Sequence, residues 1–187
     1  FEETNDRYVE PVDAMIFTPQ GDRFLWYSMR DGYKHLYLYT IDGKLIRQVT
    51  KGQFEVEGFI GFDKSGENIF VYANKDNPIG RDAYRVNLNS GKMECLTAPR
   101  NGKPYGTHSI VLNDEGTHYI DAWSSVEMPY RVDYRSVSSK GPLKTLFTDD
   151  NPLEKFAQPS YNIGTIKAAD GRTDLYYRLI TPPAMKA

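Results

Sequence analysis

Apolar and polar positions alternate along this chain in short runs that are separated by polar turns. One such unit occurs three times, at residues 16–27, 61–72 and 111–122. Each copy has an apolar run, a polar turn with glycine at a fixed place, and a second apolar run. Short alternating runs indicate β-strands, and glycine permits the positive φ of a tight turn. Each copy is therefore predicted to be a β-hairpin.

A second hairpin is predicted after each of the first ones. Residues 36–50 match residues 83–97, and residues 130–148 form a weaker third copy. The first-turn glycines are 45 and 50 residues apart: Gly21, Gly66 and Gly116. Four short strands that recur at intervals of about 40 to 50 residues are typical of β-propeller blades. A β-sandwich whose hairpins have similar lengths by coincidence is the alternative.

The predicted fold is an all-β partial β-propeller of about three four-stranded blades. Residues 1–150 form it, with blades at about 8–54, 55–105 and 106–150. A closed ring needs about four to eight blades, so three leave the ring open. The outer faces of the first and last blades are then expected to expose apolar strands. We predict that the chain self-associates, or that its tail covers an open face.

The tail has a different pattern. Residues 151–162 contain proline and show no clear period, which predicts a connector. Two apolar runs then flank an Asp170-Gly171 turn, which predicts another hairpin, and Pro182-Pro183 ends it. We interpret residues 163–187 as the start of a following domain that is cut at Ala187.

Composition excludes several classes of function. Lys and Arg total 23 and Asp and Glu total 25, so the net charge of −2 argues against a nucleic-acid partner. No apolar run of about 18 residues is present, so no membrane span is predicted. The polar, acidic start is not a signal peptide. Lone Cys95 excludes an internal disulfide framework and a cysteine-rich zinc site.

Several motifs follow one another in a fixed order. Residues 30–37 read Arg-Asp-Gly-Tyr-Lys-His-Leu-Tyr, and residues 49–56 read Val-Thr-Lys-Gly-Gln-Phe-Glu-Val. The later ones are Gly80-Arg81-Asp82-Ala83-Tyr84, Gly106-Thr107-His108-Ser109, Trp123-Ser124-Ser125 and residues 165–183. This ordered set resembles the end of the β-propeller of a dipeptidyl peptidase IV-like serine peptidase, of the prolyl oligopeptidase family. Phe54 stands where that family usually has Trp.

The resemblance implies a larger architecture. In this family an eight-bladed propeller caps an α/β-hydrolase domain, and the peptide substrate lies in the cavity between them. The chain would supply the last three blades and, at residues 163–187, the truncated start of the hydrolase domain. The parent would remove N-terminal dipeptides with Pro or Ala in second place. It would be periplasmic or extracellular, form a homo-oligomer and use no cofactor.

The catalytic serine motif of α/β-hydrolases is absent from this sequence. Such enzymes place the nucleophile in a G-x-S-x-G elbow, and no such motif occurs here. Ser109 follows Gly106 but lacks the second glycine, and the family's Ser, Asp and His lie beyond Ala187. No catalytic residue is therefore expected in this chain, which should be inactive alone and contribute the wall of the cavity.

Arg7 and Tyr8 are the candidate residues of the substrate cavity. The family has an aromatic and arginine pair near this point, and an arginine can contact a substrate carbonyl. A plain surface role is the alternative. Glu2 and Glu3 invite comparison with the paired glutamates that bind the substrate's amino terminus, but the family's pair lies in an earlier blade. A solvated chain end is the expectation for them.

Other polar residues have structural interpretations. Glu55 and Glu57 are expected to share a face of an exposed strand end. Since the histidines are far apart in sequence, no metal site is predicted. Cys95 is expected to pack as a small hydrophobe. The polar loop at residues 74–81 is either a surface connector or a rim loop that faces the cavity or a dimer partner.

Three hypotheses about function remain at this stage. The first is a non-catalytic propeller fragment of a dipeptidyl peptidase IV-like serine exopeptidase, which shapes and gates the substrate cavity. The alternative is a stand-alone β-propeller that binds proteins and has no enzymatic activity. A weaker third hypothesis is a related acylaminoacyl peptidase or oligopeptidase parent, which substrate preference would distinguish.

Overall fold

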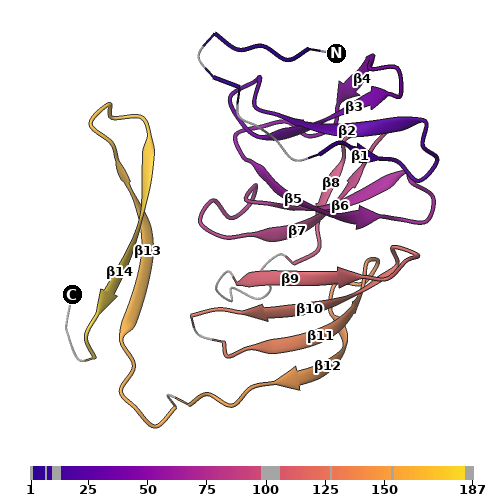
Figure 1. Ribbon diagram of the computed structural model, residues 1–187. Coiled ribbons are helices and arrows are strands. Elements are labelled where there is room, and N and C mark those ends of the chain that lie inside the picture. The colour runs from indigo at the N-terminus through magenta and orange to yellow at the C-terminus, as the bar shows by residue number, and fades with distance from the viewer. Residues whose placement is uncertain are drawn as a thin grey trace.

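The computed structural model describes residues 2–6, 8–9, 14–97, 106–126, 128–152 and 154–183. Fourteen strands and no helix occur among these residues. The strands form three four-stranded antiparallel sheets and one two-stranded sheet. The sheets lie face to face in chain order, and the two-stranded sheet stands beside them (Figure 1). The chain is an all-β partial propeller, as the repeat predicts.

Each four-stranded sheet is a meander whose strands pair in sequence order. Blade 1 consists of β1 (Ile16–Phe17), β2 (Arg23–Ser28), β3 (His35–Thr40) and β4 (Leu45–Gln48). Blade 2 consists of β5 (Val56–Phe62), β6 (Asn68–Ala73), β7 (Asp82–Asn87) and β8 (Met93–Cys95). Blade 3 consists of β9 (Thr107–Leu112), β10 (His118–Ser124), β11 (Arg131–Ser136) and β12 (Pro142–Thr148). The terminal hairpin consists of β13 (Ser160–Lys167) and β14 (Asp174–Thr181).

The glycines of the repeated turns have the backbone conformation that the sequence predicts. Gly21, Gly66 and Gly116 have φ values of 70°, 69° and 69°. In the turn of blade 2, the Asp63 carboxylate accepts hydrogen bonds from the backbone nitrogens of Glu67 and Asn68. An aspartate that accepts hydrogen bonds from nearby backbone N–H groups stabilises a turn locally. The turn of this hairpin therefore lies where the sequence predicts it.

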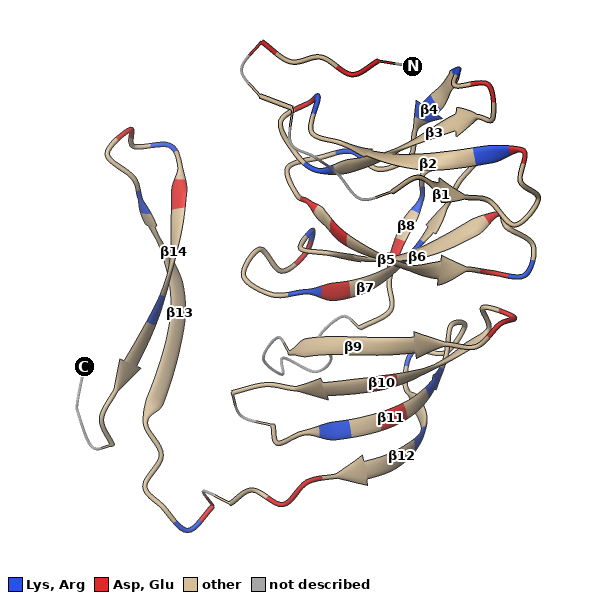
Figure 2. Ribbon diagram, viewed as in Figure 1, with Lys and Arg blue, Asp and Glu red and all other residues tan. Residues whose placement is uncertain are grey.

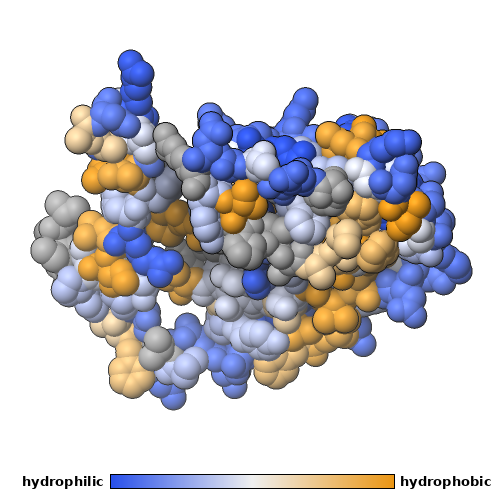
Figure 3. Space-filling view, turned by 45° about the horizontal axis from the view of Figure 1, so that its top comes forward, coloured by the Kyte–Doolittle hydropathy of each residue, from blue (hydrophilic) through white to orange (hydrophobic). Residues whose placement is uncertain are grey.

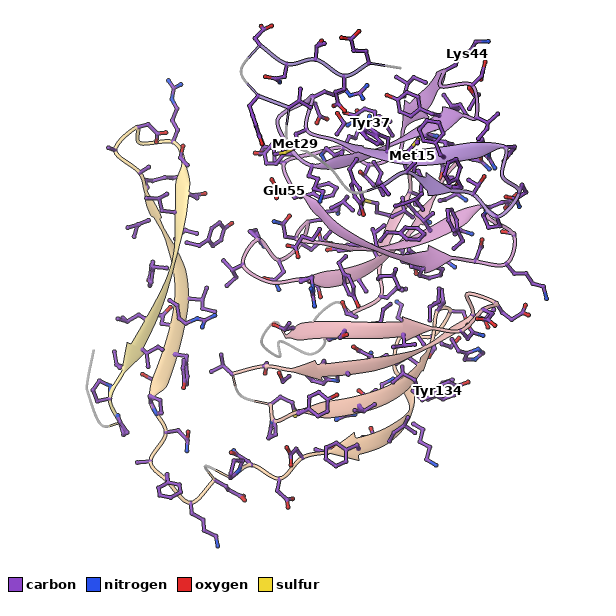
Figure 4. The ribbon with its side chains drawn as sticks, viewed as in Figure 1. Met15, Met29, Tyr37, Lys44, Glu55 and Tyr134 are labelled. Carbon is purple, nitrogen blue, oxygen red and sulfur yellow. The ribbon has the colours of Figure 1, made fainter. Side chains whose placement is uncertain are left out.

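The largest core lies between blades 1 and 2. Leu25 and Leu38 of blade 1 pack with Val71 and Val86 of blade 2, and all four are buried. Neighbouring positions on β3 point to the opposite face, because side chains alternate along a strand. Tyr37, labelled in Figure 4, therefore lies on the other side of blade 1, where it forms a cluster with Phe24 and Tyr39.

The outer face of blade 1 is less exposed than the open ring predicts. Phe24, Tyr37 and Tyr39 are each less than 5% exposed, and the Phe24 and Tyr39 rings stack at 5.3 Å. The exposed apolar residues of the blade 1 strands are Phe17, Leu45 and Ile46, on the edge strands β1 and β4. The expectation of an exposed apolar face is therefore wrong for the cluster of Phe24, Tyr37 and Tyr39. The N-terminal segment runs across this end of the molecule, beside the blade (Figure 1).

The last strand of blade 3 exposes apolar side chains, as the sequence predicts. Every residue of β12 is exposed, including Leu143, Leu146 and Phe147 at about half of their full area. Tyr134 on β11 points away from the hairpin side of the molecule (Figure 4). The terminal hairpin lies along the ends of the blades and covers neither outer face (Figure 1). The expectation that the tail packs over an open face is therefore wrong.

Candidate functional site

A cleft of about 630 Å³ separates the terminal hairpin from blades 2 and 3. Figure 3 shows openings between the hairpin, at the left, and the body of the blades. The blade side is formed by Asn77, Pro78, Ile79, Gly80, Gly106, Thr107, Ser124, Ser125 and Val126. The hairpin side is formed by Tyr161, Ile163, Tyr176 and Arg178. Residues far apart in the sequence therefore meet at one cavity.

The lining of this cleft combines apolar walls with a few polar groups. Ile79 faces the cleft from blade 2, and Tyr161 and Tyr176 face it from the hairpin. Arg178 is the single charged residue among the described residues that line it, and Figure 2 shows it as the one basic position on β14. Such a lining suits a ligand with apolar side chains and polar backbone groups.

The loop at residues 77–80 forms the blade 2 wall. Asn77 is 1% exposed, and its backbone oxygen accepts a hydrogen bond from Gly80 N at 3.0 Å. A Cβ atom on Gly80 would lie 2.0 Å from Asn77 Nδ2, so this position has no space for a side chain. The Tyr84 hydroxyl bonds both the backbone and the carboxylate of Asp76, at 3.1 Å each. Residues 77–80 of this loop therefore line the cleft, while Lys75 and Asp76 are exposed.

A buried charge cluster supports the blade 3 wall. The carboxylate of Asp121 lies 2.9 Å from His108 Nδ1 and 3.0 Å from Arg135 Nε. Arg135 Nη2 also donates to Asp133 Oδ2 at 3.2 Å. Both carboxylates are 0% exposed. Three strands, β9, β10 and β11, are thus tied together directly behind the ends that border the cleft.

Asp133 has the largest set of hydrogen bonds in this cluster. It accepts from Arg131 Nε at 2.9 Å, from the Thr145 hydroxyl at 2.8 Å and from Trp123 Nε1 at 3.1 Å. Burial raises the pKa of Asp133, but the bonds from Trp123, Arg131 and Thr145 outweigh it and hold the pKa below its usual value. The carboxylate is therefore kept charged.

For Asp82 on β7, burial has a larger effect on the pKa than hydrogen bonding has. Burial raises the pKa of Asp82, and the hydrogen bond that it accepts from the Thr97 hydroxyl at 2.7 Å offsets only part of the rise. The sequence predicts none of these three aspartates to be a buried charge. For Asp121 and Asp133, the available signal was the pair of arginines on β11, Arg131 and Arg135, which lie two positions on either side of Asp133.

Of the two predicted cavity residues, the structure describes Tyr8, which does not line this cleft. Arg7 lies outside the described residues. Tyr8 is 69% exposed, and its backbone nitrogen donates to Asn5 Oδ1 at 3.3 Å. Neither the Tyr8 ring nor its backbone is among the groups that line the cleft.

Glu2 and Glu3 have different environments. Glu2 is exposed, as the sequence predicts. The expectation of a solvated side chain is wrong for Glu3, whose side chain is only 14% exposed. Trp26 Nε1 donates to its carboxylate at 2.7 Å, and the Ser28 hydroxyl donates to it as well. The reason is tertiary, because the end of β2 presents two donors to the incoming segment.

Glu55 and Glu57 lie at the start of β5, and Glu55 is on the side of blade 2 nearer the hairpin (Figure 4). Burial raises the pKa of Glu57, Arg81 lowers it, and Glu55 raises it again. Glu57 remains exposed. Neither Glu55 nor Glu57 is among the described residues that line the cleft, so they form no acid and base pair there.

The histidines and the cysteine have structural surroundings. His35 Nε2 donates to Gly52 O at 3.0 Å, and its Nδ1 lies 3.1 Å from the Thr50 hydroxyl. His118 stacks on Tyr134 at 5.4 Å. Among the described residues, no group of three or more His, Cys, Asp or Glu is placed to hold a metal ion. Burial raises the pKa of the half-buried Cys95 thiol to about 11. The described residues include no helix that could cross a membrane.

Comparison with known families decides which group of proteins this fold represents. Residues 1–130 match the family described as the dipeptidyl peptidase IV (DPP IV) N-terminal region. The chain belongs to this family. The match spans blades 1 and 2 and reaches the end of the loop between β10 and β11 of blade 3.

Individual members of the dipeptidyl peptidase IV group agree with this assignment. Dipeptidyl peptidase 4 of Trichophyton equinum is 30% identical over 149 residues, which cover 78% of this chain and 19% of that protein. Dipeptidyl peptidase 4 of Felis catus is 30% identical over 176 residues, which cover 89% of this chain and 22% of that protein. The chain thus spans about a fifth of the length of these relatives.

Solved structures give the same result for the fold. A putative dipeptidyl aminopeptidase IV from Bacteroides ovatus superposes with a TM-score of 0.80 and 30% identity, covering 97% of this chain and 28% of that one. Porphyromonas gingivalis dipeptidyl peptidase 4 superposes with a TM-score of 0.80 and 25% identity, covering 98% of this chain and 26% of that one. Since both matches cover nearly all of the chain, the terminal hairpin is included in the similarity.

Proposed function

We propose that this chain is the non-catalytic propeller portion of a serine dipeptidyl peptidase, and that it shapes and gates the cavity that receives the peptide. In this proposal residues 1–150 are propeller, 151–162 are the connector and 163–187 begin the hydrolase domain. The observation that carries it is the cleft built jointly by blades 2 and 3 and by the terminal hairpin. Its mixed apolar and polar lining suits a peptide.

The chemistry divides between this chain and the rest of the enzyme. Acyl transfer by a serine enzyme needs a nucleophile, a histidine base, an orienting carboxylate and an oxyanion hole. The sequence supplies no G-x-S-x-G elbow for the nucleophile. The groups of this chain would bind and orient the peptide and keep water out. Holding a substrate in a fixed position lowers the entropic part of the barrier.

The substrate, location and assembly are further parts of the proposal, and they rest on the family resemblance of the sequence. The substrate is a peptide whose N-terminal dipeptide ends in Pro or Ala. Tyr8 and Arg7 line the cavity once the remaining blades are in place. The protein is periplasmic or extracellular and forms a homo-oligomer, and it has no nucleic-acid partner.

A comparison of two polypeptides tests this function. The full-length protein should release p-nitroaniline from Gly-Pro and Ala-Pro p-nitroanilides, whereas the 187-residue chain alone should not. Cleavage of N-acetylated substrates instead would favour an acylaminoacyl peptidase or oligopeptidase. A folded full-length protein that binds peptides and cleaves none of them would support the alternative of a propeller that acts only as a binding module.

A further inference from the structure

The carboxylate of Glu3 is bound by three side chains of blade 1. Trp26 Nε1 donates to Oε2 at 2.7 Å, and the Ser28 hydroxyl donates to Oε1. The Arg30 guanidinium lies 3.7 Å from Oε1. Hydrogen bonds to a charged acceptor are stronger than bonds between neutral groups. Glu3 is therefore an attachment point between the N-terminal segment and the end of β2.

The residues that receive Glu3 are themselves held in place. Arg30 Nε donates to the Ser28 hydroxyl at 2.8 Å, and Arg30 Nη2 donates to the Tyr39 hydroxyl at 2.8 Å. The Arg30 guanidinium lies 4.3 Å from the centre of the Tyr37 ring. Both tyrosines are less than 5% exposed. Contacts that do not involve Glu3 thus help to hold this site on blade 1, and a receiving site held in this way lowers the entropic cost of the attachment.

Tyr8 lies between two attachment points of the chain. Upstream, Glu3 is bound to β2, and downstream, β1 pairs with β2 through Ile16 and Leu25. The Tyr8 ring itself is 69% exposed. Fixing both ends of a segment restricts the positions that residues between them can reach. Loss of the upstream attachment would leave Tyr8 restrained from one side only.

We propose that Glu3 is a positioning residue that fastens the N-terminal segment to blade 1 and so holds Tyr8 in place to contact the peptide substrate. Glu3 does not touch the peptide in this proposal. Because the inference rests on the proposed function, it needs one measurement that is independent of catalysis and one that is not.

The first measurement is hydrogen exchange of the full-length protein. Glu3→Ala should speed amide exchange across residues 2–9 on the order of tenfold, because the segment opens locally. Glu3→Gln retains one oxygen acceptor in place of two, for either Trp26 or Ser28, and should restore part of the protection. Glu2→Ala is the matched control, since Glu2 is the exposed neighbour, and it should leave exchange unchanged. Equal exchange in the two alanine variants would overturn the proposal.

The second measurement is a double-mutant cycle on peptide cleavage by the full-length protein. Glu3→Ala and Tyr8→Ala should each raise KM on the order of tenfold and change kcat little. If Glu3 acts through Tyr8, the double variant should be no worse than Tyr8→Ala alone. Fully additive effects would overturn the positioning role. A full-length protein without any dipeptidyl peptidase activity would instead overturn the proposed function. The hydrogen-exchange result would still decide whether Glu3 fastens the N-terminal segment.

Discussion

His108 on β9 and Asp121 on β10 form a buried pair, in which Nδ1 and Oδ1 lie 2.9 Å apart. The second oxygen of Asp121 lies 3.0 Å from Arg135 on β11. One carboxylate therefore links three neighbouring strands of blade 3. Asp121 shares a face of β10 with Tyr119, which packs against Phe70 and Ala83 of blade 2.

Removing the Asp121 carboxylate should destabilise the chain strongly. Asp121→Ala leaves Arg135 buried without this partner, and such changes cost about 3–5 kcal/mol of unfolding free energy. Urea denaturation of the 187-residue chain measures the loss. Asp114→Ala, in the exposed turn before β10, is the control and should change stability little. Equal stability of the two variants would contradict a structural role for the pair.

Asp133 and Asp82 should respond to pH in opposite directions. The pKa of Asp133 is held below its usual value, so its stabilisation is present above the unfolded pKa of about 4. That stabilisation is lost as the pH falls through the lower folded pKa. Asp133→Asn should therefore lower the unfolding free energy of the chain at pH 7. The difference in unfolding free energy from the parent chain should shrink as the pH falls below about 4.

For Asp82 the effect of pH on stability is reversed, because burial raises its pKa above the unfolded value. Its charged form destabilises the fold at neutral pH, and this penalty disappears as the pH falls through the folded pKa. Asp82→Asn keeps an acceptor for Thr97 and should be at least as stable as the parent chain at pH 7. Urea denaturation at several pH values tests both variants, and a loss at pH 7 in both would contradict the assigned directions.

The turn glycines should differ in their tolerance of a side chain. Gly21 and Gly116 have nearly equal positive φ values, 70° and 69°, so alanine costs about 1–2 kcal/mol at either position from backbone strain alone. A Cβ on Gly116 would also lie 2.6 Å from the Asp63 Cα of blade 2, whereas a Cβ on Gly21 meets nothing within 4 Å. Gly116→Ala should therefore lower the unfolding midpoint clearly more than Gly21→Ala.

Arg178 should select peptides by charge. It is the single charged residue among the described residues of the cleft, so a positive field there favours an acidic group in the bound peptide. In the full-length protein, Arg178→Gln should raise KM several-fold for peptides with Asp after the released dipeptide and leave peptides with Lys there unaffected. Arg172→Gln, at the exposed tip of the same hairpin, is the control. Identical effects on both peptides would argue against an anion-binding role.

The open face of blade 3 should make the isolated chain associate. Leu143, Leu146 and Phe147 on β12 are about half exposed, and β12 is an unpaired sheet edge. Exposed apolar edges promote association. Sedimentation at micromolar concentrations should show dimers or larger species that Leu146→Lys reduces. Lys144→Glu, also exposed on β12, is the charge-change control, and a monomeric parent chain would contradict this prediction.

The blade repeat was readable from the sequence because its causes are local. Alternation gave the strands, and the glycines at 21, 66 and 116 gave the turns, since both depend on a few adjacent residues. Tyr8 illustrates the limit of such reasoning. A residue can be matched to a family position, but its surroundings depend on elements far away in the sequence.

The sequence by itself determined the strands, the turns, the blade period and the family resemblance. The tertiary structure alone decided which polar groups meet. Glu3 is largely shielded from solvent because β2 presents two donors to it, and Asp121 is buried because His108 and Arg135 come from the strands on either side. Burial of a charge is stable only where partners from other elements converge on it, and no local pattern records that convergence.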